Sequence, residues 1–254
     1  MFDKNYIKAD FGSAAASYDE KAQLQKIIRD ETISIAETYF PDNSRILDIG
    51  CGTAAFYDEV KKLDNGWWVT GVDIAYGMCK KSAEKGAMVI NADAEMLPFA
   101  DSSFDGVFSS LVMQWVDNPK QFISEILRIL KPEGMAVITS FVDGTISELE
   151  KAFAEIDSFP HISKFVPSEL LLNTVAHLGG VVLEVNDENR YVESYDDVMS
   201  VLRSIKNIGA GNKLLNRRKG LMTPRQLEKL KNSYEIEDGK YPLSWNVMTM
   251  VFEK

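Results

Sequence analysis

The chain has 254 residues, of which 45% are hydrophobic and 26% charged, as in a folded globular protein rather than a disordered one. At this length we expect one or two domains. The formal net charge of −10, from 28 basic and 38 acidic residues, argues against general binding to nucleic acid. No apolar run approaches the roughly 20 residues that span a bilayer, so no membrane attachment is expected.

The expected compartment is the cytoplasm. The amino-terminal sequence lacks the basic and apolar regions of a signal peptide. The two cysteines, Cys51 and Cys79, are too few for a disulfide framework and favour a reducing environment. No cluster of histidine, cysteine and acidic residues has the spacing of metal ligands, so we predict no metal.

Predicted strands and helices alternate through the first part of the chain, and Pro41 ends the first helical stretch. In chain order the elements are a helical stretch over 12–40, a strand over 45–49, a helix over 54–63, a strand over 68–72, a helix over 75–85, strands over 87–91 and 104–110, a helix over 119–130 and a strand over 135–141. This alternation predicts an α/β fold with a parallel sheet.

The later part of the chain is less regular. It contains predicted helices over 145–157, 167–178, 195–208 and 224–233, extended segments over 180–185 and 189–193, and a final strand over 244–252. If the final strand joins the sheet, the segment 195–235 is an insertion and not a separate domain. We therefore expect one domain over 1–254, with a helical cap over 1–40 and a cofactor-binding core over 41–142.

Positive charge is concentrated in residues 203–231. This segment holds nine lysines and arginines against one acid, Glu228, for a net charge of +8, so the rest of the chain carries −18. A basic segment on an acidic protein suggests one local acidic partner.

The first predicted strand ends in Asp48-Ile49-Gly50-Cys51-Gly52. Glycine at such a position lets the backbone approach a ligand and adopt a positive φ. The helix that follows would offer free N–H groups at its start. A lone Gly-x-Gly pair is also compatible with a purely structural turn.

Acidic residues near the other strand ends favour a nucleotide-type site. Asp73 ends the second strand and could accept both hydroxyls of a ribose. Asp93 follows the third strand, and Asp105 opens the fourth. Ligands of open α/β sheets bind in the crevice at the carboxyl ends of the strands. Both NAD and S-adenosylmethionine are candidates on this pattern.

The glycine spacing separates the two cofactors. Position 55 is alanine, so the third glycine of the NAD pattern is absent. The acid two residues before the first glycine suits a cationic ligand without phosphates. The segment resembles motif I of the class I S-adenosylmethionine-dependent methyltransferases, matched by Asp48, Gly50 and Gly52, with Ala54 in place of the last glycine.

Further motifs of that family follow between about 40 and 142. The resemblance implies that Asp73 binds the ribose, that Asp93 in the segment 91–99 reaches the adenine amine, and that 104–110 and 130–134 frame the fourth and fifth strands. It also implies a Rossmann-like, mostly parallel seven-stranded sheet with helices on both faces, a lid from the amino terminus and a carboxyl-terminal insertion. The implied cofactor-binding residues are Asp48, Gly50, Cys51, Gly52, Asp73, Ile74, Asp93, Ala94 and Ser109.

The flanking segments narrow the resemblance. Those that carry it are 11–19, 114–115, 159–167, 203–210 and 241–244. Together they are similar to the malonyl-acyl-carrier-protein O-methyltransferases of biotin biosynthesis, over nearly the whole chain. The resemblance implies methylation of the free carboxylate of a malonyl thioester on acyl carrier protein, or of malonyl-CoA, with S-adenosylhomocysteine as the other product. The basic segment supports this independently, because acyl carrier proteins are acidic.

This chemistry needs no general base. A malonyl carboxylate has a pKa of about 3–4 and is already ionised at neutral pH. One cation should hold the acceptor carboxylate, and Arg203 is our candidate, since an arginine can pair bidentately. Alternatively, Arg203 is a solvated helix residue. Tyr18 is expected to close over the cofactor or touch the malonyl end, or else to pack its helix.

The remaining candidates have structural alternatives. Gln114, Trp115 and His161 are proposed to line the acceptor pocket, although tryptophan and histidine are often structural. Cys51 is expected to supply small bulk and not a thiolate. The residues expected to meet the carrier protein, unless they form only an exposed charged loop, are Lys213, Arg217, Arg218, Lys219 and Arg225. Nothing demands an oligomer, so a monomer is expected.

Two other functions stay open on the sequence. One is a methyltransferase for a free small molecule, such as a dicarboxylic acid or a quinone precursor, with kinetics insensitive to salt. The other is a regulatory protein that binds S-adenosylmethionine without transferring its methyl group. The cofactor motif would look the same in a protein with any of these three functions. It consists of Asp48, Gly50, Gly52, Asp73 and Asp93.

Overall fold

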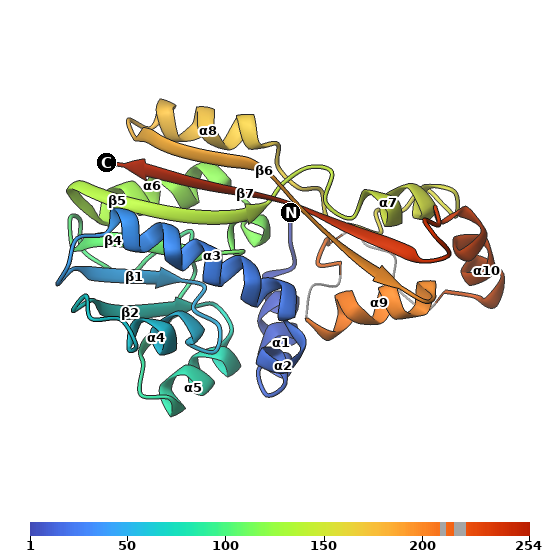
Figure 1. Cartoon of the computed structure of the whole chain (residues 1–254), viewed down its shortest axis with the longest axis horizontal. Coiled ribbons are helices and arrows are strands. Elements are labelled where there is room, and N and C mark those ends of the chain that lie inside the picture. The colour runs from blue at the N-terminus through green and yellow to red at the C-terminus, as the bar shows by residue number, and fades with distance from the viewer. Residues whose placement is uncertain (209–211, 216–221) are drawn as a thin grey trace.

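The computed structural model describes residues 1–208, 212–215 and 222–254 (Figure 1). Within these residues seven strands form one sheet in the order β3-β2-β1-β4-β5-β7-β6. The strands are β1 Arg45–Ile49, β2 Trp68–Asp73, β3 Met88–Asn91, β4 Phe104–Ser110, β5 Leu130–Phe141, β6 Val181–Tyr195 and β7 Tyr241–Glu253. Strands β1 to β5 run parallel, and β7 pairs antiparallel with both β5 and β6. The predicted class I methyltransferase architecture is confirmed.

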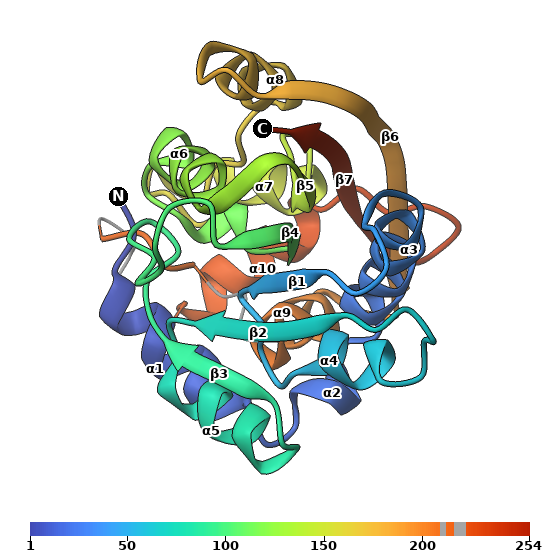
Figure 2. The ribbon, with the colours of Figure 1, turned by 90° about the vertical axis from the view of Figure 1, so that its left-hand side faces the viewer.

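Helices cover both faces of this sheet (Figure 2). They are α1 Lys4–Ala14, α2 Tyr18–Lys21, α3 Gln23–Tyr39, α4 Ala55–Val60, α5 Tyr76–Glu84, α6 Pro119–Ile129, α7 Ser147–Ala154, α8 Ser168–His177, α9 Val198–Asn207 and α10 Pro224–Ser233, with a 3₁₀ turn, η1, over Met113–Trp115. Helices α6 and α8 pack on one face, and α3 and α4 on the other. Because both faces are covered, the central strand β4 is almost entirely buried, as parallel strands usually are.

A second lobe extends from the carboxyl ends of the parallel strands. Strands β6 and β7 pair along most of their length and run beyond the sheet into this lobe (Figure 1). Helices α9 and α10 lie between them in the chain and, with α7, bury a separate hydrophobic cluster that includes Val198, Val201, Leu230 and Trp245. A capping box at Thr223 and Gln226 defines the start of α10. Because β7 pairs with β5 and β6, the final strand joins the sheet, as the insertion hypothesis requires.

The amino-terminal region differs from its prediction. The single helical stretch expected over 12–40 is three helices, interrupted at Ser17 and Ala22, whose φ and ψ angles are not helical. Helix α1 packs on α5 through two glycines, and a Cβ atom on Gly77 would lie 2.5 Å from the Gly12 carbonyl oxygen. This contact joins segments far apart in the chain, which the local helical pattern does not report. It places α1 and α2 beside the sheet edge where ligands bind.

Two boundaries in the sheet also differ from expectation. Strand β5 begins at Leu130, five residues before the predicted start. The two extended segments expected over 180–185 and 189–193 form the single strand β6, with an irregularity between Asn186 and Asn189. None of the described helices is long and apolar enough to cross a bilayer. Among the described residues no three His, Cys, Asp or Glu side chains come together as a metal site.

Candidate functional site

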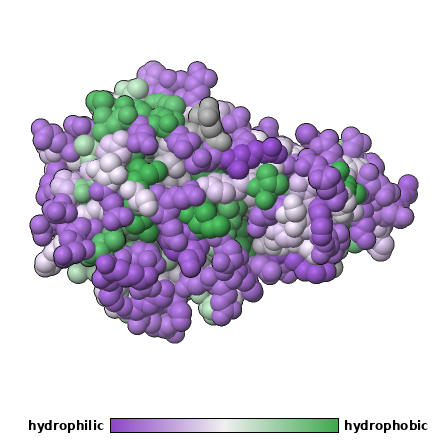
Figure 3. Space-filling model, viewed as in Figure 1, coloured by the Kyte–Doolittle hydropathy of each residue, from purple (hydrophilic) through white to green (hydrophobic). Residues whose placement is uncertain are grey.

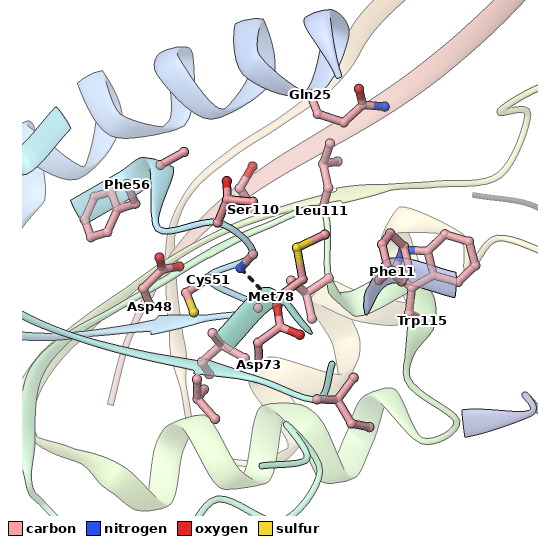
Figure 4. Close-up of a pocket in the computed structure, with 18 of the residues that line it drawn as sticks. Phe11, Gln25, Asp48, Cys51, Phe56, Asp73, Met78, Ser110, Leu111 and Trp115 are labelled. Atoms are coloured by element: carbon pink, nitrogen blue, oxygen red, sulfur yellow. Dashed lines mark hydrogen bonds between the residues drawn. The ribbon is translucent and has the colours of Figure 1, made fainter. Parts of the chain in front are cut away.

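A cavity of about 350 Å³ lies at the carboxyl ends of the parallel strands (Figure 4). The sheet side of the cavity is formed by the glycine loop after β1 and by the ends of β2 and β4. The cap side is formed by α1, α2 and the first turns of α3. Asp73 and Trp115 both line it, with Trp115 beside Phe11 to the right of Asp73 in Figure 4, so the predicted cofactor motif and the predicted acceptor region share one cavity.

The glycine loop has the conformation that its sequence predicts. Gly50 and Gly52 have φ angles of 72° and 53°, in the left-handed region that favours glycine. A Cβ atom on Gly50 would lie 2.1 Å from Cγ2 of Val112. Ala54 also has a positive φ, of 64°. It therefore keeps the left-handed conformation although it replaces the glycine of the family pattern.

Asp73 is fixed at the end of β2 by backbone donors. Its carboxylate accepts hydrogen bonds from the N–H of Gly52 at 3.0 Å and from the N–H of Ala75 at 2.7 Å. Burial raises the pKa of Asp73 to about 6, although these two donors act in the opposite direction. The carboxylate is thus held in one orientation, with lone pairs left to accept from a ligand hydroxyl.

Asp48 is the most buried acid of the cavity, at 3% exposure. Burial raises its pKa to about 8, and the charge of Asp73 adds to this, while Arg29 opposes it. A positively charged ligand would stabilise both carboxylates, whereas an anionic ligand would meet repulsion. The electrostatics therefore fit the sulfonium and ammonium groups of S-adenosylmethionine better than a pyrophosphate.

Asp93 is held by the cap. Its Oδ2 atom lies 2.6 Å from Nζ of Lys4, and Oδ1 accepts from the backbone N–H of Glu95 at 3.0 Å. Nζ of Lys4 also lies 2.5 Å from a carboxylate oxygen of Glu95. Ile74, Asp93 and Ala94 line the cavity. The segment that holds Asp93 and Ala94 therefore lines the cavity, and α1 is tied to it by an ion pair.

The acceptor side is apolar and aromatic. Trp115 packs edge-on against Phe11 and Phe2, with ring centroids 5.6 and 6.1 Å apart. Gln114 donates to the Leu111 carbonyl at 2.8 Å and accepts from the Ser140 hydroxyl at 3.2 Å, which fixes its amide. Tyr18, Gln114 and Trp115 all line the cavity, as the sequence predicted for them.

Burial raises the pKa of Tyr18 to about 12, with smaller contributions from nearby acids. Its phenol is thus neutral and can donate a hydrogen bond at physiological pH. Beside it, Asp19 accepts a 2.5 Å hydrogen bond from the hydroxyl of Thr53 in the glycine loop, and Lys85 bridges Asp19 and Asp58. Helix α2 is therefore also tied to the cofactor-binding loop.

Three predicted site residues lie elsewhere. Arg203 is exposed on α9 and does not line the cavity. His161 stacks on Phe153 with centroids 4.2 Å apart and bonds to Asp157 at 2.7 Å, and it does not line the cavity. The Ser109 side chain is buried in the sheet, where its hydroxyl donates to the Ile49 carbonyl at 3.1 Å. Because side chains alternate along a strand, Ser110 and not Ser109 lines the cavity.

The five residues expected to dock the carrier protein do not share one environment. Lys213 is fully buried, so the prediction that it lies on an exposed surface is wrong. The reason is a buried ion pair with Asp10 of α1, 203 positions away in the chain. Arg225 is exposed at the start of α10. Arg217, Arg218 and Lys219 lie outside the described residues.

One stripe of cavity residues was missed. Positions 22, 25, 26 and 29 fall on one face of the helical register, and all four line the cavity. Arg29 is the half-buried cation of this stripe, and its charge acts on both Asp48 and Tyr18. The helical spacing of these residues was visible in the sequence. Which way this helix face points depends on the break at Ala22, and only the fold reveals that break.

The chain is similar to known methyltransferases. A family described as methyltransferase domain matches residues 47–138. The malonyl-[acyl-carrier protein] O-methyltransferase of Laribacter hongkongensis (strain HLHK9) is 31% identical over 97% of this chain and 88% of that protein. The biotin biosynthesis bifunctional protein BioHC of Cellvibrio japonicus (strain Ueda107) is 33% identical over 99% of this chain and 50% of its own. The solved structure of a proposed methyltransferase from Bacillus halodurans C-125 has a TM-score of 0.63 at 16% identity, covering 89% of this chain and 97% of its own.

Proposed function

This chain belongs to the family of malonyl-[acyl-carrier protein] O-methyltransferases, and we propose that it methylates the free carboxylate of a malonyl thioester on an acyl carrier protein. The observation that carries the proposal is similarity over nearly the whole chain, including the cap and the α9–α10 lobe outside the 47–138 core. The product would be the malonyl methyl ester, in the pathway of biotin biosynthesis. S-adenosylmethionine is the cofactor of this enzyme class.

The residues present fit that cofactor. Asp48 is buried and Asp73 partly buried beside it, and the glycine loop leaves open space at Gly52, where an added Cβ atom would meet nothing within 4 Å. When bound, S-adenosylmethionine supplies a methyl group on a positively charged sulfur. We propose that Asp73 accepts the ribose hydroxyls, that Asp93 and Ala94 face the adenine, and that Asp48 stabilises the positive charge.

The acceptor site is suited to an ionised nucleophile. A malonyl carboxylate, with a pKa of about 3–4, loses its proton before it binds. Tyr18 is neutral at the same pH, so its O–H can orient one carboxylate oxygen but cannot act as a base. The aromatic wall at Trp115 and Phe11 excludes water from the reacting atoms. Catalysis then consists of alignment, without proton transfer.

The cation that holds a ligand carboxylate is reassigned from Arg203 to Arg29. Among the described residues, the lysines and arginines that line the cavity are Lys4, Lys26, Arg29 and Lys85. Lys4 and Lys85 are each paired with two acids of the site, and Lys26 is exposed. Arg29 is 18% exposed and lines the cavity, and among the described residues its guanidinium forms an ion pair only with the more exposed Asp30 of the same helix, at 2.6 Å. Arg29 could hold the malonyl carboxylate or the methionine carboxylate of the cofactor. The KM for the acceptor and the Kd for the cofactor of an Arg29 variant distinguish these two roles.

The α9–α10 lobe is the proposed carrier-binding surface. Its surface is mainly hydrophilic (Figure 3, right), and Arg203, Lys206, Arg225 and Lys229 are exposed on it. These cations would attract an acidic carrier protein and orient its thioester toward the cavity. Both cysteines are unpaired, which fits a cytoplasmic location, and a monomer is part of the same proposal.

The direct test is intact-protein mass spectrometry. The purified protein is mixed with S-adenosylmethionine and malonyl-acyl carrier protein, with malonyl-CoA and free malonate as parallel acceptors. A mass gain of one methylene that strongly favours the carrier thioester would support the proposal. Equal or better methylation of free malonate would favour the small-molecule alternative. Cofactor binding without methylation of any malonyl acceptor would overturn the proposed acceptor.

A further inference from the structure

Lys213 is a fully buried lysine outside the cavity. Its ammonium group forms an ion pair with Asp10 and lies 4.6 Å from the centre of the Tyr6 ring and 5.8 Å from that of Phe11. Burying an ammonium group is costly unless a counter-ion and polarisable neighbours surround it. All three of these neighbours belong to α1, so these contacts join Lys213 to the amino-terminal helix.

The backbone around Lys213 pairs with the start of the chain. The N–H of Asp3 donates to the Lys213 carbonyl at 2.8 Å, Phe2 and Leu214 form an antiparallel bridge, and the N–H of Leu215 donates to the Met1 carbonyl at 3.4 Å. We call residues 1–14 the strap. The strap is therefore fastened to residues 213–215 by backbone pairing and by one buried ion pair.

The strap is also a wall of the cofactor cavity. Lys4, Ile7 and Phe11 line the cavity from the strap side. Lys4 reaches across to Asp93, and Phe11 packs on Trp115. Asp10 precedes Phe11 directly, so the ion pair with Lys213 lies immediately behind the cavity wall.

We propose that Lys213 is a positioning residue, which holds the strap closed over the bound cofactor through Asp10. Separation of the strap from residues 213–215 is then a required step in the exit of the cofactor product. The proposal assigns Lys213 a role in cofactor retention in place of carrier docking. It rests on the cofactor-binding part of the function and not on the identity of the acceptor.

The test measures how fast bound cofactor leaves the full-length protein. Radiolabelled S-adenosylmethionine is bound and chased with an excess of unlabelled cofactor, for the native protein, Asp10→Asn, Lys213→Met and the double variant. Lys62→Met, which breaks the exposed ion pair with Glu59, is the matched control.

Both single variants should release the cofactor about tenfold or more faster, because each removes the ion pair between Asp10 of the strap and the fully buried position of Lys213. The double variant should be no faster than Lys213→Met, since the pair is already broken, and Lys213→Arg should retain slow release. Lys62→Met should match the native protein.

A release rate within twofold of native for folded Lys213→Met would overturn the proposal, as would additive effects in the double variant. Should Lys213→Met fail to fold, Asp10→Asn carries the test, because the Asp10 side chain is 34% exposed and asparagine preserves its size. Faster release from a stably folded Asp10→Asn distinguishes a positioning role from a purely structural one. Failure of malonyl methylation in the native protein would leave this result unaffected.

Discussion

Asp48 and Asp73 lie on neighbouring parallel strands, and the charge of Asp73 reinforces the effect of burial on Asp48. The pKa values of about 8 and about 6 mean that the free protein holds part of this pair protonated at neutral pH. A cationic ligand favours the ionised forms of both acids. Cofactor binding and proton release are therefore linked at this site.

Cofactor affinity should rise as the pH increases from about 6 to 8 in the native protein, because ionised Asp48 attracts the cation and protonated Asp48 does not. Isothermal titration calorimetry in buffers of different ionisation enthalpy should detect proton release at pH 7. Asp48→Asn should bind more weakly and with a much flatter dependence on pH. Asp64→Asn, in an exposed loop, should retain the native profile. A native affinity that is constant over this range would contradict the linkage.

The stability of the free protein should depend on pH in the opposite direction. The folded-state pKa of Asp48 is raised above its unfolded value of 3.8, so its contribution to stability is greatest at low pH and is lost as the pH rises toward 8. Each unit of such a shift corresponds to roughly 1.4 kcal/mol.

Urea denaturation should therefore show that the free energy of unfolding of Asp48→Asn, minus that of the native protein, increases from pH 5 to pH 8. A constant difference between the two proteins would show that Asp48 is not held with a raised pKa.

Gly50 and Gly52 provide a matched pair of substitutions. Both have left-handed backbones, so an added Cβ atom strains either position by about 1–2 kcal/mol. At Gly50 the new atom also overlaps Val112, whereas at Gly52 it meets nothing within 4 Å. We expect Gly50→Ala to lose a further 1–3 kcal/mol or so through overpacking.

Chemical denaturation of the two variants checks this difference. Adding Val112→Ala to Gly50→Ala should restore part of the lost stability, because it removes the overlapping Cγ2 atom. Equal unfolding free energies for Gly50→Ala and Gly52→Ala would contradict the steric account.

Arg29→Gln tests which carboxylate the cavity cation holds. Loss of a charge-assisted bidentate contact costs roughly 1.5–3 kcal/mol, or about tenfold or more in binding. A higher KM for malonyl-acyl carrier protein with an unchanged cofactor Kd would assign Arg29 to the acceptor. A weaker cofactor Kd would assign it to the methionine carboxylate. Native values for both constants would remove Arg29 from the site.

The sheet and the cofactor acids could be read from the sequence because both depend on local pattern. Strands β1 and β4 and helix α10 have their predicted bounds, and Asp48 and Asp73 stand at strand ends as expected. The break between α1 and α3 could not be read, since α1 packs on α5, a helix far away in the sequence. Helical periodicity alone cannot report a contact between distant segments.

Lys213 illustrates the same limit for side chains. Lysines are almost never fully buried unless they are paired. The sequence around Lys213 does not identify the acid that pairs with it. The partner is Asp10, which only the fold brings near. The net charge of the segment 203–231 was therefore a poor guide to the position of this one residue.

Charge reversal on the α9–α10 lobe should separate carrier docking from chemistry. Arg203→Glu and Arg225→Glu should each raise the KM for malonyl-acyl carrier protein, because both exposed side chains would then repel an acidic partner. Methylation of malonyl-CoA at saturation should keep its native kcat, since neither residue lines the cavity. The dependence of kcat/KM on salt should weaken in both variants, because salt screens an attraction that they no longer have. Lys62→Glu, at an exposed turn after helix α4, changes net charge equally and should leave the carrier KM unchanged. A comparable rise in KM with Lys62→Glu would show that net charge, and not a local surface, attracts the carrier.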